Sequence, residues 1–391
     1  MLPVSYSLGN VVARPGRSLV MIVVVALVVV ACSLFLGLLS SLRRTVATTG
    51  DPMNLVVLRK GSDNDGSSQI TRLAYDSVRY LDGIATREDG ERLVSPELVV
   101  QPFFWTKQGG RENVLVRGVE PPAFDVHRDV AIAEGRPLRP RMGEALVGKA
   151  LRGRYRGADL GEVLEFGRNR WTVVGILESG GSSFESEVWV DAADLSNDAR
   201  RINPYSGVRL RAASEADLVS IKARVDSDPR YALEASRESE YYAKQAETAG
   251  SLTFLVLAIS ILAGTGAGFG AANTMYASVQ SRTAEIGTLR ALGFPRGAIL
   301  LSFEIEAVVL ALAGFALGAA LSLALAEVLR HVLGGVTFGA RTFTTNVVTL
   351  SITANDLVLA FGLSLGIGLF GGLGPAWRAA RLRPIEALRK A

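Results

Sequence analysis

The segment 19–42 constrains this chain most, because it contains no charged residue over 24 positions. As an α-helix it would be about 36 Å long, which is enough to cross the hydrocarbon core of a bilayer. Two processing signals compete with this interpretation. A secretory signal has a shorter apolar core and a cleavage site. Val29-Val30-Ala31-Cys32 resembles a lipoprotein cleavage box, but the apolar run continues beyond Cys32. We therefore predict an uncleaved transmembrane helix.

Three further apolar runs, 251–279, 299–329 and 357–377, are also long enough to span a membrane. Arginine clusters orient the four spans. Arg14 and Arg17 precede the first span, and Arg282, Arg290 and Arg296 lie between the second and third. The residues after the fourth span are Arg378, Arg381, Arg383, Arg389 and Lys390. Positively charged residues in short loops stay in the cytoplasm. This pattern places both termini of a multi-pass membrane protein in the cytoplasm.

The predicted fold is four transmembrane α-helices with an α+β extracytoplasmic domain inserted between helices 1 and 2. The predicted segments are a cytoplasmic interfacial helix (1–18), transmembrane helices (19–42, 249–280, 299–329, 357–377), the extracytoplasmic domain (43–248), a cytoplasmic helix (281–298), a short extracytoplasmic loop (330–356) and a cytoplasmic tail (378–391). Short strand-like runs alternate with polar stretches through the inserted domain, which is typical of an α+β fold. Its most apolar part, 99–105, is either a core strand or an exposed patch.

No catalytic or metal site is predicted. The chain has one cysteine, and its two histidines, His127 and His331, lie far apart, which excludes a cysteine-based zinc cluster and an HExxH-type site. The acids of the loop 61–68 lack the spacing of an EF-hand. A net charge of +4 without a basic stripe argues against a nucleic-acid partner.

The stretch GEALVGKA, residues 143–150, fits the first seven positions of a phosphate-binding loop. Ala150 stands where that motif needs Ser or Thr to hold Mg²⁺. An extracytoplasmic position would also keep the stretch away from cytoplasmic ATP. The surrounding residues predict a helix over GEALVGKA and then a β-hairpin, with strands 163–166 and 171–176 joined by a turn. The match to a nucleotide-binding loop is therefore interpreted as a coincidence.

Small residues recur in the membrane spans at spacings that allow helices to pack closely. The glycines concerned are Gly264, Gly266, Gly268, Gly270, Gly314, Gly318, Gly362 and Gly366. They serve either packing within one chain or a seam between two chains, and both interpretations stay open.

The segment 280–294 predicts a short amphipathic helix parallel to the membrane. Ile286, Leu289 and Leu292 would form an apolar side that fits a groove on a partner, and Glu285 and Arg290 would flank it. Gly293 and Pro295 would end the helix. The alternative is an interfacial helix anchored by arginines.

Charged residues also lie near the inner ends of the spans. Glu304 and Glu306 lie near the start of the third span, where a lone charge is costly. We expect these carboxylates either to snorkel to the interface or to pair with Arg282 or Arg296, and a proton relay is the alternative. The basic residues expected to meet anionic headgroups of membrane lipids are Arg14, Arg17, Arg378, Arg381 and Arg383.

Three stretches resemble FtsX/MacB-type ABC permeases. Residues 132–177 (IAEGRPLRPRMGEALVGKALRGRYRGADLGEVLEFGRNRWTVVGIL) resemble the MacB-like periplasmic core domain. Residues 272–300 (ANTMYASVQSRTAEIGTLRALGFPRGAIL) are similar to the family's second helix and its coupling helix. Residues 372–389 (GLGPAWRAARLRPIEALR) are similar to its C-terminal end.

The resemblance implies a non-catalytic permease subunit that transmits ATP-driven motion to its extracytoplasmic domain. Its expected partners are a cytoplasmic ABC ATPase dimer that binds ATP and Mg, a second permease chain (identical or different), and a periplasmic adaptor, substrate protein or enzyme. Members of the MacB branch carry a fused N-terminal ATPase, and this sequence opens at its first span, so the expected layout is that of lipoprotein-releasing permeases, with a separate ATPase. Export or extraction of a lipid, lipoprotein or peptide is the first expectation. An FtsX-like regulator of a periplasmic or cell-wall enzyme is the alternative.

The coupling-helix residues that the resemblance assigns to ATPase contact are Arg282, Glu285, Ile286, Leu289, Arg290, Leu292, Gly293, Pro295 and Arg296.

Overall fold

The computed structural model describes residues 15–333, 336–339, 345–348 and 350–382. The chain forms two compact units. Unit 1 comprises Met1–Ser41, Ser251–Val332 and Leu350–Ala391, and unit 2 comprises Leu42–Gly250 and Leu333–Thr349. This division matches the prediction of a membrane part interrupted by a folded domain after its first helix.

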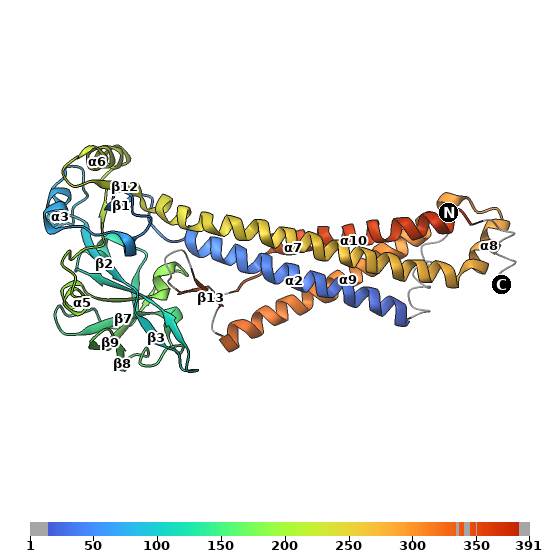
Figure 1. The fold of residues 1–391 in the computed structure, drawn as a ribbon, viewed down its shortest axis with the longest axis horizontal. Coiled ribbons are helices and arrows are strands. Elements are labelled where there is room, and N and C mark those ends of the chain that lie inside the picture. The colour runs from blue at the N-terminus through green and yellow to red at the C-terminus, as the bar shows by residue number, and fades with distance from the viewer. Residues whose placement is uncertain (1–14, 334–335, 340–344, 349, 383–391) are drawn as a thin grey trace. The chain divides into compact units, whose positions relative to one another are not determined.

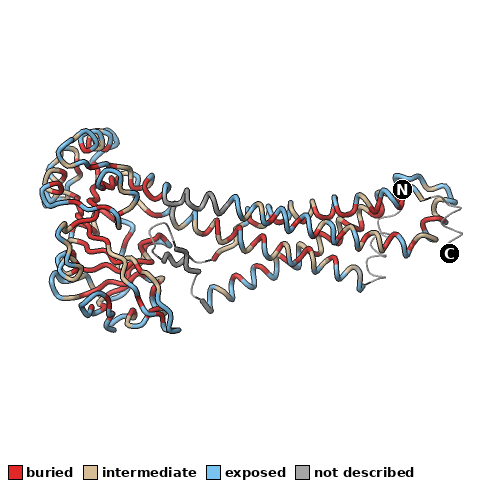
Figure 2. Tube along the Cα trace, viewed as in Figure 1, coloured by how far each residue is buried: buried red, intermediate tan, exposed pale blue. Residues whose placement is uncertain are grey.

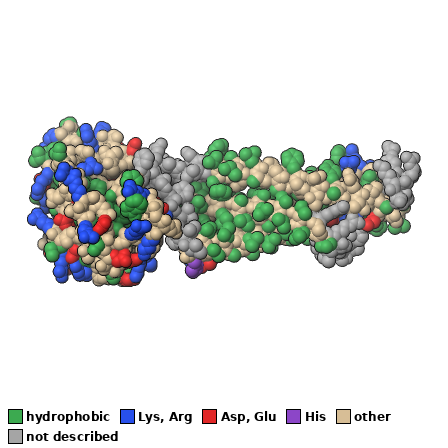
Figure 3. Space-filling model, turned by 60° about the horizontal axis from the view of Figure 1, so that its bottom comes forward, with side chains coloured by type: hydrophobic (Ala, Val, Ile, Leu, Met, Phe, Trp, Pro, Cys, Tyr) green, Lys and Arg blue, Asp and Glu red, His purple; other side chains and the backbone are tan. Residues whose placement is uncertain are grey.

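Unit 1 is built from long helices that run side by side (Figure 1). The helices are α2 (Pro15–Ala47), α7 (Glu238–Ser281), α8 (Thr283–Ala291), α9 (Arg296–Leu333) and α10 (Ala354–Ala380), of which α2, α7 and α9 begin or end in unit 2. Among the described residues, α2, α7, α9 and α10 are long and apolar enough to cross a membrane. Hydrophobic side chains cover much of the visible face of this unit (Figure 3). The prediction of four apolar helices is therefore confirmed.

Unit 2 contains a mixed ten-stranded sheet in the order β12-β1-β11-β2-β5-β10-β7-β9-β6, with β8 paired to β9. The strands of this sheet are β1 (Asn54–Arg59), β2 (Val94–Val100), β5 (Leu115–Val119), β6 (Ala131–Gly135), β7 (Glu144–Gly148), β8 (Val163–Phe166), β9 (Asn169–Glu178), β10 (Glu187–Asp191), β11 (Gly207–Arg211) and β12 (Leu233–Arg237). The pairs β5–β10 and β7–β9 are parallel, and the others are antiparallel.

The remaining elements of unit 2 pack on this sheet or lie beside it. They are α3 (Arg72–Arg79), α4 (Ala123–Val126), α5 (Ala192–Ala199), α6 (Glu215–Ser227), and the two hairpins β3–β4 (Phe103–Trp105, Arg111–Asn113) and β13–β14 (Val336–Gly339, Thr345–Val348). One hydrophobic core joins α3 and α6 to β1 and β11, and another lies under β5, β7, β9 and β10. The buried strands stand out in Figure 2. An α+β domain was predicted and is found.

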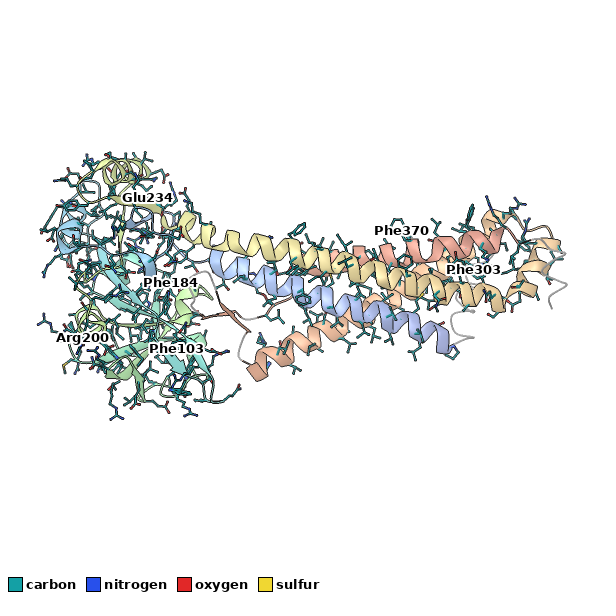
Figure 4. The ribbon with its side chains drawn as sticks, viewed as in Figure 1. Phe103, Phe184, Arg200, Glu234, Phe303 and Phe370 are labelled. Carbon is teal, nitrogen blue, oxygen red and sulfur yellow. The ribbon has the colours of Figure 1, made fainter. Side chains whose placement is uncertain are left out.

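The apolar segment 99–105 was predicted to be either a core strand or an exposed patch, and it has features of both. Phe104 is buried in the core, whereas Phe103 and Trp105, its neighbours on the hairpin strand β3, are exposed. Alternating side chains of a strand point to opposite faces, so both interpretations apply to one segment. Phe103 is labelled in Figure 4.

The stretch GEALVGKA contains a strand, and the prediction of a helix there is wrong. Residues Glu144–Gly148 form β7 between β10 and β9, and every residue of this strand is buried. A short, fully buried apolar run has no polar face, so its periodicity does not separate helix from strand. The hairpin β8–β9 that comes after it was predicted correctly. Lys149 is exposed and pairs with Glu178.

Two guanidinium groups are buried in the centre of the sheet. Arg117 on β5 makes two hydrogen bonds of 2.6 Å to Glu187 and a third to Glu97. Arg209 on β11 bonds Glu97 and Asp65, both at 2.7 Å. Glu97 on β2 therefore bridges both arginines. Because each charge is compensated by a direct hydrogen bond, the cluster can exist away from water.

The same cluster reaches the first turn of α7. His127 Nε2 lies 2.7 Å from Glu97 Oε1. The Glu238 carboxylate accepts hydrogen bonds from the Asn54 side chain (2.9 Å) and from the Asp51 N–H (3.0 Å). Tyr241 and Tyr242 are buried in a core beneath β7 and β10. The predicted span began at residue 249; the helix begins at Glu238, because these early turns are held by burial in unit 2 rather than by an apolar sequence.

Glu97 makes unit 2 sensitive to acid. Burial alone would raise the pKa of this carboxyl, but Arg209, His127 and Arg117 together hold it below the ordinary value of 4.5. A folded-state pKa below the unfolded one stabilises the fold above pH 4.5, and this stabilisation is lost as the pH falls through the folded value. We expect Glu97→Gln to lower the free energy of unfolding at pH 7 by about 3–5 kcal/mol.

The measurement is thermal or denaturant unfolding between pH 7 and 3, in which the variant should show a weaker dependence on pH. Glu165→Gln, at an exposed pair with Arg170, is the control and should behave as wild type. Equal stability of Glu97→Gln and wild type at pH 7 would refute the role of the cluster.

Gly148 is required by close packing rather than by a nucleotide. A Cβ at this position would lie 2.1 Å from the carbonyl oxygen of Glu185. We expect Gly148→Ala to lower the stability of unit 2 by about 1–3 kcal/mol or more, because an added methyl group overpacks the core. Lys149→Ala should leave the unfolding midpoint nearly unchanged. The reverse ranking of the two variants in a melting experiment would show that the interpretation is wrong.

Candidate functional site

The helix α8 lies between α7 and α9. It contains four of the nine residues predicted to contact an ATPase, and the other five flank it. It ends in a Schellman motif: the Phe294 N–H bonds the Leu289 carbonyl and the Gly293 N–H bonds the Arg290 carbonyl, both at 3.2 Å. Gly293 has φ +91°, the left-handed conformation that glycine adopts without strain. The predicted helix stop at Gly293 is therefore present, and Pro295 immediately precedes α9.

Arg282 fixes the junction of α7 and α8. Its side chain is 4% exposed, donates a 2.8 Å hydrogen bond to Glu306 on α9, and contacts Glu285 at 3.2 Å. The guanidinium also lies 4.9 Å from the ring centre of Phe303, which is labelled in Figure 4. The expected pairing of Glu306 with Arg282 is thus found, and Phe303 is a partner that the sequence did not predict. Buried pairs of this kind hold elements in one arrangement.

The predicted apolar side of α8 does not face outward as a whole. Ile286 is 2% exposed and Leu289 is half-buried, and both pack in the core formed by α2, α7, α9 and α10. Leu292 is 72% exposed. A spacing of three residues predicts a common face but not what that face contacts, and here the helix's own neighbours cover most of it.

The outward side of α8 and its following turn is mixed in character. It presents Glu285, Thr288 and Leu292, followed by the exposed Gly293, Pro295 and Arg296. We call this side the docking edge of α8. Arg290 is half-buried and donates a 2.8 Å hydrogen bond to the Phe294 carbonyl, so it braces the turn beside this edge.

Glu304 differs from Glu306. One of its carboxylate oxygens is buried, and no hydrogen-bond partner for that atom is found in the part of the chain that the structure describes. A Cβ at Gly372 of α10 would come within 3.0 Å of this oxygen. The expected pairing of Glu304 with Arg282 or Arg296 is therefore not found.

The predicted packing glycines separate into two groups. Gly314 and Gly318 of α9 approach α2 so closely that an added Cβ would lie 2.7 Å from Val25 and Val29, and Gly264 meets Leu363 at 2.8 Å. These glycines serve packing within the chain. At the other positions an added Cβ would meet nothing within 4 Å in the described chain; they are Gly266, Gly268, Gly362 and Gly366. At Gly270 it would make only an ordinary contact, at 3.9 Å.

Basic and aromatic side chains gather at the end of α10. Arg381 lies 3.8 Å from the ring centre of Trp377, and Arg378 lies 5.7 Å from that of Tyr276 on α7. Aromatic and cationic side chains are typical of membrane interfaces. Arg14 and Arg383 lie outside the described residues, and Arg17 is placed in α2 without a described side chain.

Breaking the Arg282–Glu306 pair should destabilise unit 1. We expect Arg282→Met to lower its stability by about 3–5 kcal/mol, because Glu306 is then left charged and buried. The double variant Arg282→Met/Glu306→Leu should regain most of the loss. Glu285→Gln, at a half-exposed contact, should cost at most about 1 kcal/mol.

Melting of the detergent-purified chain measures these differences. If the double variant were no more stable than Arg282→Met, the buried pair would not account for the effect.

Two family models match this chain. The first, described as a MacB-like periplasmic core domain, matches residues 18–228, and the second, an FtsX-like permease C-terminal, matches residues 255–384. The first model therefore covers α2 and most of unit 2, and the second covers α8 together with the other three long helices. The first match thus contains the first long helix and most of the folded domain, and the second contains the later long helices.

The chain is similar to several curated proteins named "Macrolide export ATP-binding/permease protein MacB", among them those of two organisms. It is 26% identical to that of Bdellovibrio bacteriovorus over 96% of this chain and 59% of the relative, and 28% identical to that of Rhodopseudomonas palustris over 73% and 44%. The chain thus spans about half the length of these relatives.

Several solved structures are also similar to the chain. They include the extracellular domain of the noncanonic ABC-type transporter YknZ from Gram-positive bacteria (16% identity, 47% of this chain and 99% of that one, TM-score 0.37) and the periplasmic region of MacB from Actinobacillus actinomycetemcomitans (12%, 50% and 92%, 0.37).

The family models cover the folded domain and the long helices in the order in which the structure builds them. This multi-pass membrane protein belongs to the FtsX/MacB-type permease family of ABC transporters.

Proposed function

We propose that this chain is a permease subunit whose helix α8 binds a separate cytoplasmic ATPase and whose helix α7 carries the resulting movement to unit 2. One observation supports this most: α7 is a single helix from Glu238 to Ser281. Glu238 is fixed in the core of unit 2, and Arg282, directly after the helix, is fixed against α9. A continuous helix held at both ends transmits displacement along its axis.

The docking edge of α8 suits this role. Leu292 offers an exposed apolar contact, and Glu285 and Arg296 offer charged contacts at its rim. The opposite side, with Ile286, is packed against the long helices. Pressure on the edge would therefore reach α7 and α9 rather than deform a loose loop.

The proposed orientation follows from charge. Arg290 lies on α8 itself. The ends of α7, α9 and α10 that adjoin α8 carry Arg282, Arg296, Arg378 and Arg381. The excess of arginine in these short segments supports a cytoplasmic position for α8 and an extracytoplasmic position for unit 2 in the bacterial inner membrane. ATP and Mg would be bound by the ATPase partner, not by this chain.

The proposed output is export or extraction of an extracytoplasmic lipid, lipoprotein or peptide. The open glycine faces of α7 and α10 support a second permease chain, because small residues let helices of different chains approach closely in lipid. The relatives' name combines an ATP-binding and a permease function, which agrees with an ATPase as the driving partner.

Leu292→Asp tests the docking edge. When the tagged chain is purified from native membranes, we expect the variant to recover at least about tenfold less ABC ATPase than wild type does. The reason is that a charge replaces an apolar contact. The fold should be kept, since Leu292 is 72% exposed. The matched control is Ile202→Asp, at a position of unit 2 that is 97% exposed.

Mass spectrometry of the purified complex reads the result. Unchanged ATPase recovery with Leu292→Asp would contradict docking at this edge. Leu289→Asp is a weaker probe, because Leu289 is half-buried and its loss also disturbs internal packing.

A further inference from the structure

A pocket of about 200 Å³ opens in unit 2 at the edge where two parallel strands end. The strands β5 and β10 are in register, with Val119 opposite Asp191, so Glu120 and Asp191 emerge at the same edge of the sheet. Ligands of α/β sheets commonly bind beyond the carboxyl ends of parallel strands. The pocket is not part of α8 or of the buried charge cluster.

The walls of the pocket are apolar and rigid. Pro121, Pro137 and Pro140 contribute rings with a fixed backbone φ and no N–H donor. Phe124 and Leu138 also line it and pack against the core beneath β7 and β10. Such a lining offers acceptors and apolar surface but few donors, which disfavours an anion.

Two carboxylates contribute the polar part of the lining. Asp191 is held in place as the N-cap of α5, where its Oδ1 accepts the N–H groups of Ala193 (3.1 Å) and Asp194 (3.0 Å). Glu120 is half-buried, and among the described residues no hydrogen bond reaches its carboxylate. The pocket therefore contains two carboxylates, of which Asp191 is held by hydrogen bonds and Glu120 is available to a ligand.

The electrostatic surroundings leave Glu120 undercompensated. Burial is the main cause that raises the pKa of its carboxyl; Arg79 and Arg72 act in the opposite direction, while Asp191 and Glu91 add to the rise. The net effect is a raised pKa. Arg79 instead contacts Asp76 and the rings of Tyr75 and Tyr80. A cation inside the pocket would supply the missing compensation.

We propose that this pocket binds an ammonium group carried on a compact apolar body. The ammonium donates hydrogen bonds to the Glu120 and Asp191 carboxylates. The apolar body packs on Phe124 and the proline rings, and the electron-rich face of Phe124 also favours a cation nearby. The volume suits a group of the size of one aromatic or branched side chain. The ligand is either a free small amine or the amino terminus of a polypeptide.

Binding of phenylalanine amide to the purified full-length chain tests the proposal. At about pH 6 its amine is protonated, whereas N-acetylphenylalanine amide has the same body without the charge. By calorimetry or saturation-transfer NMR we expect the amine to bind at least about tenfold more tightly than the acetylated compound. Equal binding of the two compounds, or no saturable binding of the amine, would overturn the proposal.

Variants locate the binding at the two acids. Glu120→Gln and Asp191→Asn should each weaken binding of the amine by about tenfold or more. Asn retains the N-cap of α5, so the fold of Asp191→Asn should be kept, which circular dichroism would check. Glu88→Gln, at an exposed acid outside the pocket, is the matched control. Full binding by Glu120→Gln would contradict the assignment.

A peptide of eight residues beginning with phenylalanine separates the two sources. Binding of the free peptide but not of its acetylated form would assign the pocket to polypeptide amino termini. Binding of phenylalanine amide alone would assign it to small amines. These experiments use the permease chain without an ATPase, so their failure would leave the docking proposal for α8 untouched.

Discussion

The sharing of Glu97 between Arg117 and Arg209 is the interaction on which the folded domain depends. Each arginine lies on a different strand next to β2, and both donate to the same carboxylate oxygen. Removing any one of these charges would leave another uncompensated away from water, which costs several kcal/mol. The two hydrophobic cores on the sheet therefore cannot separate without breaking the cluster. Since Glu238 is also in contact with Arg209 at 3.5 Å, the first turn of α7 belongs to the same rigid body.

Buried charge is used in the same way after the other end of α7. Arg282 is enclosed by Glu306 and Phe303, much as Arg209 is enclosed by its acids. Apolar packing alone lets helices slide, because one methyl contact replaces another at little cost. A buried ion pair has a direction and a distance, and sliding by one turn would separate its charges. Under the proposed function, this difference explains why both ends of a long apolar helix are fixed by charged side chains.

The features predicted correctly are those that local sequence determines. Long runs without charge indicate membrane helices, and Gly293 followed by Pro295 indicates a helix stop, whatever surrounds them. The failures all depend on tertiary contacts. Residues 144–148 are a strand because sheet neighbours enclose both faces, and nothing in the run itself says so. The polar start of α7 is helical because Tyr241 and Tyr242 are buried in a distant part of the chain. The apolar side of α8 that includes Ile286 was predicted, but its packing against the long helices of the same chain was not.

The glycines of the long helices show why one motif has two outcomes. Gly314 and Gly318 have a helix of their own chain within van der Waals distance, whereas Gly362 and Gly366, at the same spacing, have open space in the described chain. In a membrane, the groove beside such a glycine is filled either by lipid or by another helix. Glycine in a helix interior costs about 0.5–1 kcal/mol relative to alanine. Lipid would accommodate alanine at these positions equally well. A close helix contact therefore explains better why glycine, with its cost, recurs here at a spacing of four residues. Under the proposed function, a second permease chain would pack against these open faces.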